Sequence, residues 1–295
     1  MAELGVVHLV RQANGVAPFA SFIRSYTERP AGAAHELIVI FKGFDGAVVP
    51  GEYQDLLHGL AHRLVFFPDE GFDIRSYFAA ARAFDYHHYL FLNSFSVILG
   101  DNWLGKMYGQ TKREGVGIVG ATGSYESTYS NYAGELRRGQ RRWFHRGSPA
   151  TEYRNLRAAL RLRLQFAPFP NYHLRSNAFL IPRDLMLRLK TPSLEDRQDA
   201  LRFESGRNGW TRQVAAMGLR ALVVGLDGRG YEKESWPESF TFRIGEQHNL
   251  LVADNRTRQY EEADEEFRRF MTKITWGRVS QAGCGAGQIS EGVFS

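Results

Sequence analysis

The sequence predicts an α/β fold in which a mostly parallel central sheet is covered by helices on both faces. Short continuous apolar runs alternate with amphipathic segments through the first half of the chain. Such runs are typical of strands that are buried on both faces, as in parallel βαβ units. We expect this domain to occupy residues 1–260, and residues 261–295 to form a smaller C-terminal extension made of a helix and a flexible tail.

The expected strands and helices alternate from the N-terminus. Strands are predicted at 6–10, 36–41, 63–67, 88–94, within 116–124, at 177–182 and at 219–225, and helices at 18–27, 52–62, 209–217 and 261–272, with one more that ends at 83. Pro18 suits a helix start, because its missing N–H is not needed in the first turn. The glycine-rich segment 281–295 is expected to be flexible or ordered by a partner.

Four strand ends carry polar residues or glycine. They are Arg11–Asn14, Phe44–Gly46, Pro68–Asp73 and Asn93–Ser96. Ligands of open α/β sheets bind beyond the carboxyl ends of the strands. These four segments are therefore the predicted ligand-binding loops.

The composition argues against a disordered, disulfide-rich or membrane-spanning chain. Hydrophobic residues make up 43% and charged residues 23% of the 295 residues, which are ordinary values for a globular protein. Cys284 is the only cysteine, so no internal disulfide can form. There is no run of 18 apolar residues and no signal-peptide pattern. These features predict a cytoplasmic protein.

A basic stretch runs from Arg137 to Arg163 and contains nine arginines against one acid, Glu152. Such a stretch attracts phosphates, anionic glycans, acidic lipid headgroups or nucleic acid, but it is also the pattern of a solvated helix face. It contains no recognisable nucleic-acid-reading motif, so we expect no nucleic-acid partner. An anionic acceptor, or peripheral contact with the inner membrane, is the partner that it predicts.

The common catalytic signatures are absent. Arg11–Gly15, after the first strand, lacks the glycine spacing of dinucleotide-binding proteins. The sequence contains no phosphate-binding P-loop, no His-Glu-x-x-His zinc motif and no Gly-x-Ser-x-Gly nucleophile elbow. The signatures of the common dehydrogenase, kinase and hydrolase classes are therefore missing, which narrows the range of functions.

Four segments follow one another in the order VVHLVRQANG, ELIVIFKGFD, DEGFDIRSYFAAARAFDYHHYLFLNS and FESGRNGWTRQVAAMGLRALVVG. Together they resemble the nucleotide-sugar-dependent glycosyltransferases of the GT-A fold, particularly the large bacterial family-2-like group of inverting enzymes. The resemblance covers roughly Val6 to Gly225. It implies transfer of a sugar from a nucleotide-sugar donor to a glycan or lipid-linked acceptor, in the synthesis of a surface polysaccharide.

The resemblance assigns donor-binding residues to the strand ends. They are Arg11, Gln12, Ala13, Asn14, Asp45, Asp73, Arg75, Asn93, Ser94 and Phe95. Asp73 would contact ribose or sugar hydroxyls, and Arg75 would contact phosphate. The alternative is that Asp73 is the N-cap of a helix and that Arg75 is solvated.

Acceptor contacts are expected in Pro170–Asn177, the segment densest in hydrogen-bonding side chains. In the family this neighbourhood lies between the donor and acceptor sites. The resemblance therefore implies that His173, Arg175 and Asn177 contact acceptor hydroxyls or the donor phosphate. For His173 the alternative is a purely structural role.

The resemblance also implies that Glu204 is the catalytic base. An inverting transfer requires a carboxylate that removes the proton of the acceptor hydroxyl. Glu204 is followed by Ser-Gly-Arg-Asn-Gly, which predicts a turn just ahead of a helix. The alternatives are an acid placed near a helix start by the helix dipole, and the rival pair Glu195-Asp196, for which a solvated turn is expected.

The sequence departs from the family at the metal motif, where the family has Asp-x-Asp and this chain has Asn93–Ser96. A hard divalent cation prefers several anionic oxygen ligands. Three alternatives stay open. Mn²⁺ or Mg²⁺ is held by other groups such as Asp101 or His248, the diphosphate is neutralised by arginines, or the protein binds a glycan without catalysis. The candidate arginines are Arg75, Arg175 and Arg207.

Overall fold

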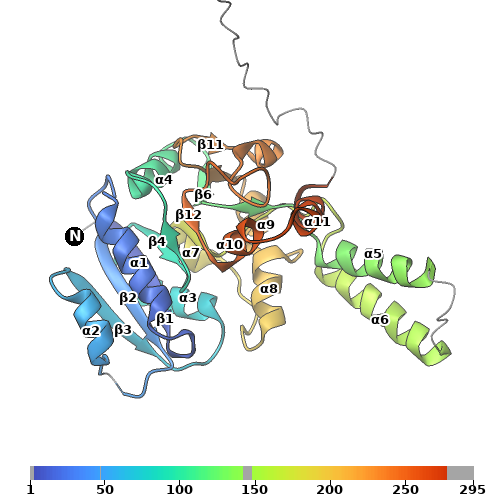
Figure 1. Ribbon diagram of the computed structural model, residues 1–295, viewed down its shortest axis with the longest axis horizontal. Coiled ribbons are helices and arrows are strands. Elements are labelled where there is room, and N and C mark those ends of the chain that lie inside the picture. Colours follow the sequence, from blue (N-terminus) through green and yellow to red (C-terminus); the bar gives the residue numbers. More distant parts are fainter. Residues whose placement is uncertain (1–2, 47, 142–147, 278–295) are drawn as a thin grey trace, which may run out of the picture.

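The computed structural model describes residues 3–46, 48–141 and 148–277 and is built on an eight-stranded sheet (Figure 1). The strand order is β11-β10-β6-β9-β4-β1-β2-β3. The strands are β1 Leu4–Arg11, β2 Glu36–Lys42, β3 His62–Phe67, β4 His88–Leu92, β6 Val116–Gly120, β9 Ala178–Pro182, β10 Arg220–Val224 and β11 Gly230–Tyr231. Strands β3, β2, β1 and β4 run parallel, as do β6 and β10, whereas β9 is antiparallel to β4 and β6, and β11 to β10. The predicted mostly parallel α/β fold is confirmed.

Helices cover both faces of this sheet, as Figure 1 shows. The helices are α1 Ala17–Glu28, α2 Gly51–Leu57 and α4 Trp103–Thr111 on one face, and α3 Asp73–Ala83, α7 Arg183–Arg188, α8 Arg197–Ser205 and α9 Trp210–Ala216 on the other. Successive strand residues point to opposite faces. Val6 therefore packs in one buried cluster with Phe22 of α1, and Val7 in the other with Tyr77 of α3.

Two small sheets and two helices complete the body. They are β5 Val97–Ile98 with β12 Val252–Ala253, β7 Gly123–Ser124 with β8 His173–Leu174, α10 Asn255–Glu261 and α11 Glu265–Trp276, with short 3-10 turns at Gln12–Asn14, Lys233–Ser235 and Pro237–Ser239. Trp276 of α11 is buried, and its indole N–H donates to the Phe242 carbonyl at 2.7 Å. The helix expected near 261–272 is thus present, whereas the tail 281–295 lies outside the described residues.

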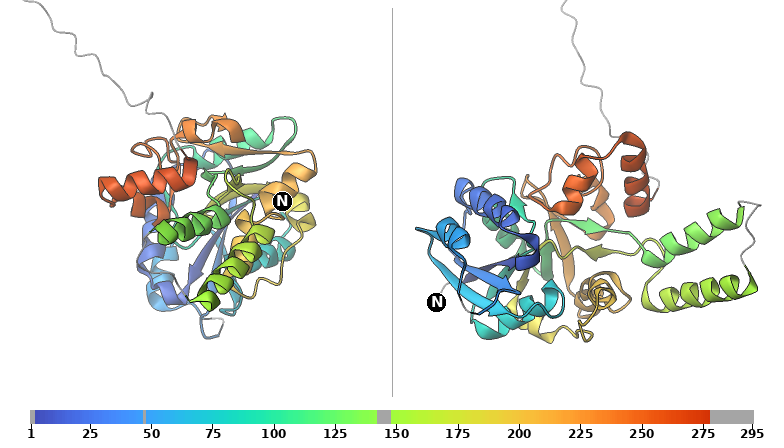
Figure 2. Two further views of the ribbon diagram at one scale, coloured as in Figure 1. Left: turned by 90° about the vertical axis from the view of Figure 1, so that its right-hand side faces the viewer. Right: turned by 60° about the horizontal axis from the view of Figure 1, so that its bottom comes forward.

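A pair of helices, α5 Thr128–Arg141 and α6 Pro149–Gln165, projects from the body (Figure 2). Its base is attached by hydrogen bonds from Ser127 Oγ to the Ala167 carbonyl at 2.6 Å and from the Arg207 N–H to the Gln165 carbonyl at 2.8 Å. This pair contains most of the basic stretch predicted from the sequence. Among the described residues, no helix has both the length and the apolar composition needed to cross a bilayer.

The helix predicted at 52–62 is shorter than expected, because α2 ends at Leu57. Gly59 has a φ of +77°, a left-handed conformation that breaks a helix and that glycine adopts without a steric penalty. The chain then enters β3 at His62. The sequence contained a helix-stop signal, the dipeptide His58-Gly59, but the apolar periodicity of this region favoured a longer helix.

His8 lies within the apolar core between β1 and α1. It is fully buried, and its ring stacks on Phe22 at 3.7 Å between centroids with an interplanar angle of 3°. Neither ring nitrogen has a hydrogen-bond partner among the described residues. Burial lowers the pKa of His8 to about 3, because the charged imidazolium would lose its hydration. His8 is therefore a neutral core residue.

Candidate functional site

The carboxyl ends of the parallel strands meet at one end of the sheet, which we call the carboxyl end. Because β9 runs antiparallel, its beginning rather than its end lies there, beside the end of β4. The Asn93 N–H accordingly donates to the Asn177 carbonyl at 3.0 Å. The antiparallel pair of β12 with β5 brings the residue after Ala253, Asp254, to the same place. The topology thus gathers segments that are far apart in the chain.

A charged cluster lies where β1, β2 and β3 end. The guanidinium of Arg11 donates through Nε and Nη2 to the two carboxylate oxygens of Asp69, each at 2.8 Å, which raises the pKa of Arg11 and lowers that of Asp69. Lys42 is almost completely buried and donates to the Gly71 carbonyl, and burial lowers its pKa. Burial raises the pKa of Asp73, although the charges of Lys42 and Arg11 oppose this. The cluster can bind hydroxyl or phosphate groups.

The predicted donor residues occupy this region unevenly. Asp73 is the first residue of α3 rather than its N-cap, which is Phe72, so the capping alternative is wrong. Arg75 is exposed and lies 3.8 Å from the Glu70 carboxylate. Asp45 is exposed in the loop after β2. The remaining predicted residues of this group lie in the 3-10 turn directly after β1, namely Gln12, Ala13 and Asn14.

The segment Asn93–Ser96 forms a turn held by neutral oxygens. The Asn93 side-chain oxygen accepts from the Phe95 N–H at 3.0 Å and from the Ser96 hydroxyl at 3.1 Å. Ser94 is buried. The Asn177 side-chain oxygen, nearby, accepts from the Thr122 hydroxyl at 2.6 Å. This segment can offer amide and hydroxyl groups to a ligand, but no negative charge.

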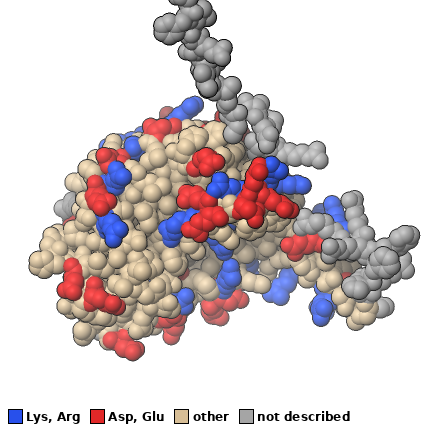
Figure 3. All heavy atoms as spheres, viewed as in Figure 1, with Lys and Arg blue, Asp and Glu red and all other residues tan. Residues whose placement is uncertain are grey.

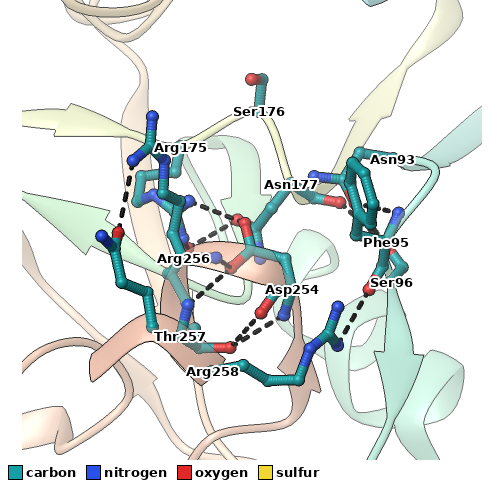
Figure 4. Close-up of polar contacts among 12 residues, drawn as sticks. Asn93, Phe95, Ser96, Arg175, Ser176, Asn177, Asp254, Arg256, Thr257 and Arg258 are labelled. Carbon is teal, nitrogen blue, oxygen red and sulfur yellow. Dashed lines mark hydrogen bonds and ion pairs between the residues drawn. The ribbon is translucent and has the colours of Figure 1, made fainter. Parts of the chain in front are cut away.

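An ion pair between Arg175 and Asp254 closes one side of this turn (Figure 4). The Arg175 Nη2 donates to Asp254 Oδ2 at 2.7 Å, and its guanidinium carbon lies 4.1 Å from the centre of the Phe242 ring. Asp254 Oδ1 accepts from the N–H groups of Arg256 and Thr257. Burial raises the pKa of Asp254, but the combined effect of Arg175 and these N–H groups is larger and lowers it, so the pKa of Asp254 is below its ordinary value. Asp254 is thus a fully bonded carboxylate.

These residues do not fit a divalent cation. Within residues 3–46, 48–141 and 148–277, no three His, Cys, Asp or Glu side chains come together in a way that could hold a metal ion. The carboxylate beside Asn93–Ser96 is Asp254, and both its oxygens are already engaged with donors. Arg258, whose Nη1 donates to the Phe95 carbonyl at 3.3 Å, adds positive charge to the turn. A cation would meet repulsion and neutral ligands.

The other candidates for binding a metal or the diphosphate lie elsewhere. Asp101, one of the alternative metal ligands, pairs with Arg29 at 3.4 Å beyond the C-terminal end of α1. The exposed ring of His248 stacks on Phe240 at 4.7 Å between centroids. The Arg207 guanidinium donates to the Arg163 carbonyl at 3.0 Å, at the base of the projecting helices. Of the three predicted arginines, Arg175 is the one that contacts residues of the turn region.

Glu204 lies in the last turn of α8, not in the turn that the sequence predicted, because α8 continues to Ser205. Its carboxylate accepts from the N–H of Ser176 at 2.7 Å and from the Ser176 hydroxyl. Ser176 lies between the predicted acceptor residues Arg175 and Asn177. The structure therefore brings Glu204 to the carboxyl end of the sheet. The rival Asp196 is the N-cap of α8 and accepts from the Asp199 N–H at 2.7 Å.

His173 lies deeper than a ligand-contacting residue would. It is buried, and its Nδ1–H donates to the Asn171 carbonyl at 2.7 Å. Burial lowers the pKa of His173, although the charge of Glu204 opposes this shift. This geometry favours the structural alternative, in which His173 orders the segment that leads to Ser176.

The sequence analysis assigned no individual role to four residues of the site, although one of them, Ser176, lies within the segment Pro170–Asn177 where acceptor contacts were expected. They are Lys42, Ser176, Asp254 and Arg258. Lys42 had a visible signal, since a lysine directly continues the apolar run ELIVIF. Asp254 had none, because it is 79 residues away from Arg175 in the chain and no local pattern links them.

No family model matches this chain, and no curated protein sequence is similar to it. Among solved structures, it is similar to the mannosyltransferase PcManGT from Pyrobaculum calidifontis in complex with GDP-Man and Mn²⁺, with a TM-score of 0.48 and 13% identity over 79% of this chain and 57% of that chain. A second similar structure is glucosyl-3-phosphoglycerate synthase from Mycobacterium tuberculosis in complex with Mn²⁺, UDP and phosphoglyceric acid. Its TM-score is 0.35, with 21% identity over 62% of this chain and 57% of that chain. A third is TarS 1–349 from S. aureus, with a TM-score of 0.41 and 11% identity over 68% of this chain and 53% of that chain. The chain thus spans little more than half the length of these neighbours.

Proposed function

We propose that the protein is a glycosyltransferase that moves a sugar from a nucleoside-diphosphate sugar to a hydroxyl group of a glycan or lipid-linked acceptor, in surface polysaccharide synthesis. One observation carries the proposal: the Glu204 carboxylate accepts a hydrogen bond from the N–H of Ser176 at the carboxyl end of the sheet. The residue after Ser176 is Asn177, whose carbonyl accepts from the N–H of Asn93 in the turn Asn93–Ser96. A base and a polar ligand-binding turn at that end of an α/β sheet are what a group transfer between two bound substrates requires. The sequence resemblance to GT-A glycosyltransferases supports the same assignment.

In this proposal the donor lies across the ends of β1 to β4. The nucleoside contacts Arg11–Asn14, Asp45 and Asp73, and the diphosphate lies at Asn93–Ser96. The acceptor hydroxyl attacks the anomeric carbon and forms the new C–O bond while the bond to the diphosphate oxygen breaks. Its proton passes to the Glu204 carboxylate, and the nucleoside diphosphate leaves with the bonding electron pair. Attack from the face opposite the leaving group inverts the anomeric centre.

The negative charge of the leaving group is neutralised by arginine in this scheme. Arg258 lies beside the turn, and Arg175 adjoins it while paired with Asp254. Guanidinium groups form paired hydrogen bonds with phosphate oxygens, so they can take over charge neutralisation from a metal. The donor set described above, which does not fit a divalent cation, supports this version of the reaction.

A binding screen tests the proposed function. Purified protein is heated with UDP-, GDP- and dTDP-sugars, in the presence of either Mn²⁺ or EDTA, and its melting temperature is recorded. A ligand present at 100 times its Kd stabilises the folded state by about 2.7 kcal/mol, so the true donor is expected to raise the melting temperature, and to do so equally well in EDTA. If a nucleotide sugar stabilised the protein in Mn²⁺ but not in EDTA, donor binding would depend on a metal ion, and the metal-free version of the reaction would be wrong. Absence of any response would favour the alternative of a non-catalytic glycan-binding protein.

Replacement of Arg258 by Ala is expected to weaken donor binding by about 10- to 100-fold, because a hydrogen bond to a charged group contributes about 1.5–3 kcal/mol. Titration calorimetry with the donor identified by the screen measures this change. Arg269→Ala is the matched control. It removes one positive charge from the exposed surface of α11, where Arg269 pairs with Glu265, and should leave donor affinity unchanged. Equal affinities of both variants would remove Arg258 from the donor site.

A lipid-linked acceptor requires access to a membrane surface. We propose that the basic stretch Arg137–Arg163 provides peripheral contact with the inner membrane. On the face of the molecule shown in Figure 3, basic and acidic side chains are otherwise intermixed over the body. Such a mixed surface provides no comparable attraction for an anionic bilayer or for nucleic acid.

A further inference from the structure

The outer face of α6 carries a stripe of exposed apolar side chains. Its members are Tyr153, Leu156, Leu160 and Leu164, with exposed fractions of 62%, 58%, 53% and 79%. Spacings of three and four residues place these side chains on one side of a helix. A run of large apolar groups left in water is unusual in a protein without a partner at that surface.

The stripe faces away from the rest of the described chain. The opposite side of α6 packs on α5, where the Tyr132 hydroxyl donates to the Asn155 side-chain oxygen at 3.5 Å and Leu162 is half-buried. Both helices project from the body, as Figures 1 and 2 show. The stripe is therefore available to a large surface outside the molecule.

Arginines border this stripe. Successive residues of an α-helix are rotated by about 100° about its axis. This rotation places Arg157 and Arg161 along one edge of the stripe, Arg154 further round the helix on the same side, and Arg163 along the other edge. All four are exposed, and the guanidinium carbon of Arg157 lies 5.7 Å from the centre of the Tyr153 ring. An apolar stripe bordered by basic residues is the pattern of helices that lie in the interface of a bilayer.

We propose that α6 lies in the interface of an anionic lipid bilayer, with the stripe inserted among the acyl chains and the bordering arginines on lipid phosphates. A second copy docked through the same stripe would bring arginines against arginines, with Glu152 as the single acid of α6 to offset them. Charge therefore favours lipid over self-association. The inference deepens the proposed peripheral membrane contact and rests on it, but it involves neither nucleotide nor sugar.

Vesicle binding of the purified protein tests this inference. Protein is sedimented with vesicles of phosphatidylcholine alone and with vesicles that also contain phosphatidylglycerol, and binding is expected to the second kind. Combined replacement of Leu156, Leu160 and Leu164 by Ser should lower the partition coefficient by about 100-fold. Arg157→Gln with Arg161→Gln should lower it by about 30-fold and should leave the apolar packing of α6 unchanged.

A matched control replaces exposed apolar residues elsewhere, Leu201→Ser with Met217→Ser, and is expected to bind vesicles as the wild type does. The inference is overturned if anionic vesicles are not bound, or if the triple serine variant binds them as well as the wild type. It is also overturned if the wild type is a dimer in size-exclusion chromatography that the serine changes dissociate. None of these results affects transfer to a soluble acceptor, which the serine variant should retain.

Discussion

Replacement of Glu204 by Gln is expected to lower the rate of sugar transfer by about 1,000-fold, because general-base catalysis typically contributes between about 10² and 10⁴. The glutamine side chain has the same shape and can still accept a hydrogen bond from Ser176, but it cannot take up the proton of the acceptor hydroxyl. The loss should appear in kcat, while the Kd of the donor stays within about twofold of the wild type. Initial rates and calorimetric titration of each purified variant measure the two quantities.

Two further variants separate catalysis from a structural role of Glu204. Glu195→Gln changes an exposed acid that lies shortly before α8 in the chain and should leave kcat unchanged. Ser176→Ala removes a hydroxyl that donates to Glu204 but keeps the carboxylate, so it should cost far less than the loss of the base. If Glu204→Gln instead lowers the melting temperature and donor affinity with little change in kcat, its carboxylate only holds the segment between β8 and β9 in place.

The order and type of the main elements could be predicted because each parallel strand is a continuous apolar run. The run ELIVIF occupies β2 almost exactly as expected, since a strand buried on both faces needs apolar residues at every position. The direction of β9 could not be predicted, because an apolar run such as AFLI is the same pattern in either orientation. Yet that direction decides that Asn177 lies beside Asn93.

The candidate site was predictable only where it follows a strand directly. Arg11 is the last residue of β1, and Asn93 directly follows β4, so the general rule for α/β sheets identifies both as candidate ligand-binding residues. Asp254 and Arg258 reach the site through β12, a strand of two residues that leaves no periodicity to detect. The apolar residues of the stripe on α6 are visible in the sequence, but they alternate with arginines, so the sequence analysis identified this segment only as a basic stretch.

Replacement of His8 by Phe is expected to stabilise the protein selectively at acidic pH. The folded-state pKa of about 3 lies below the value of 6.5 expected in the unfolded chain, so the unfolded state binds more protons between these values. The stability of the wild type therefore falls as pH decreases from 6.5 towards 3, by about 1.4 kcal/mol per unit. At pH 5 the loss due to His8 is about 2 kcal/mol relative to pH 8, and a phenylalanine ring, which can keep the stack on Phe22, does not suffer it.

Urea unfolding of wild type and variant at pH 8 and pH 5 measures this effect as a difference of differences, which cancels the contributions of all other titrating groups. His8→Leu is a second replacement in case the larger phenylalanine ring strains the core. His58→Gln is the matched control, because it replaces a histidine whose side chain is exposed rather than buried in the core. An equal difference between wild type and His8→Phe at both pH values would mean that His8 titrates normally in the folded protein, and hence that water reaches the ring despite its position between β1 and α1.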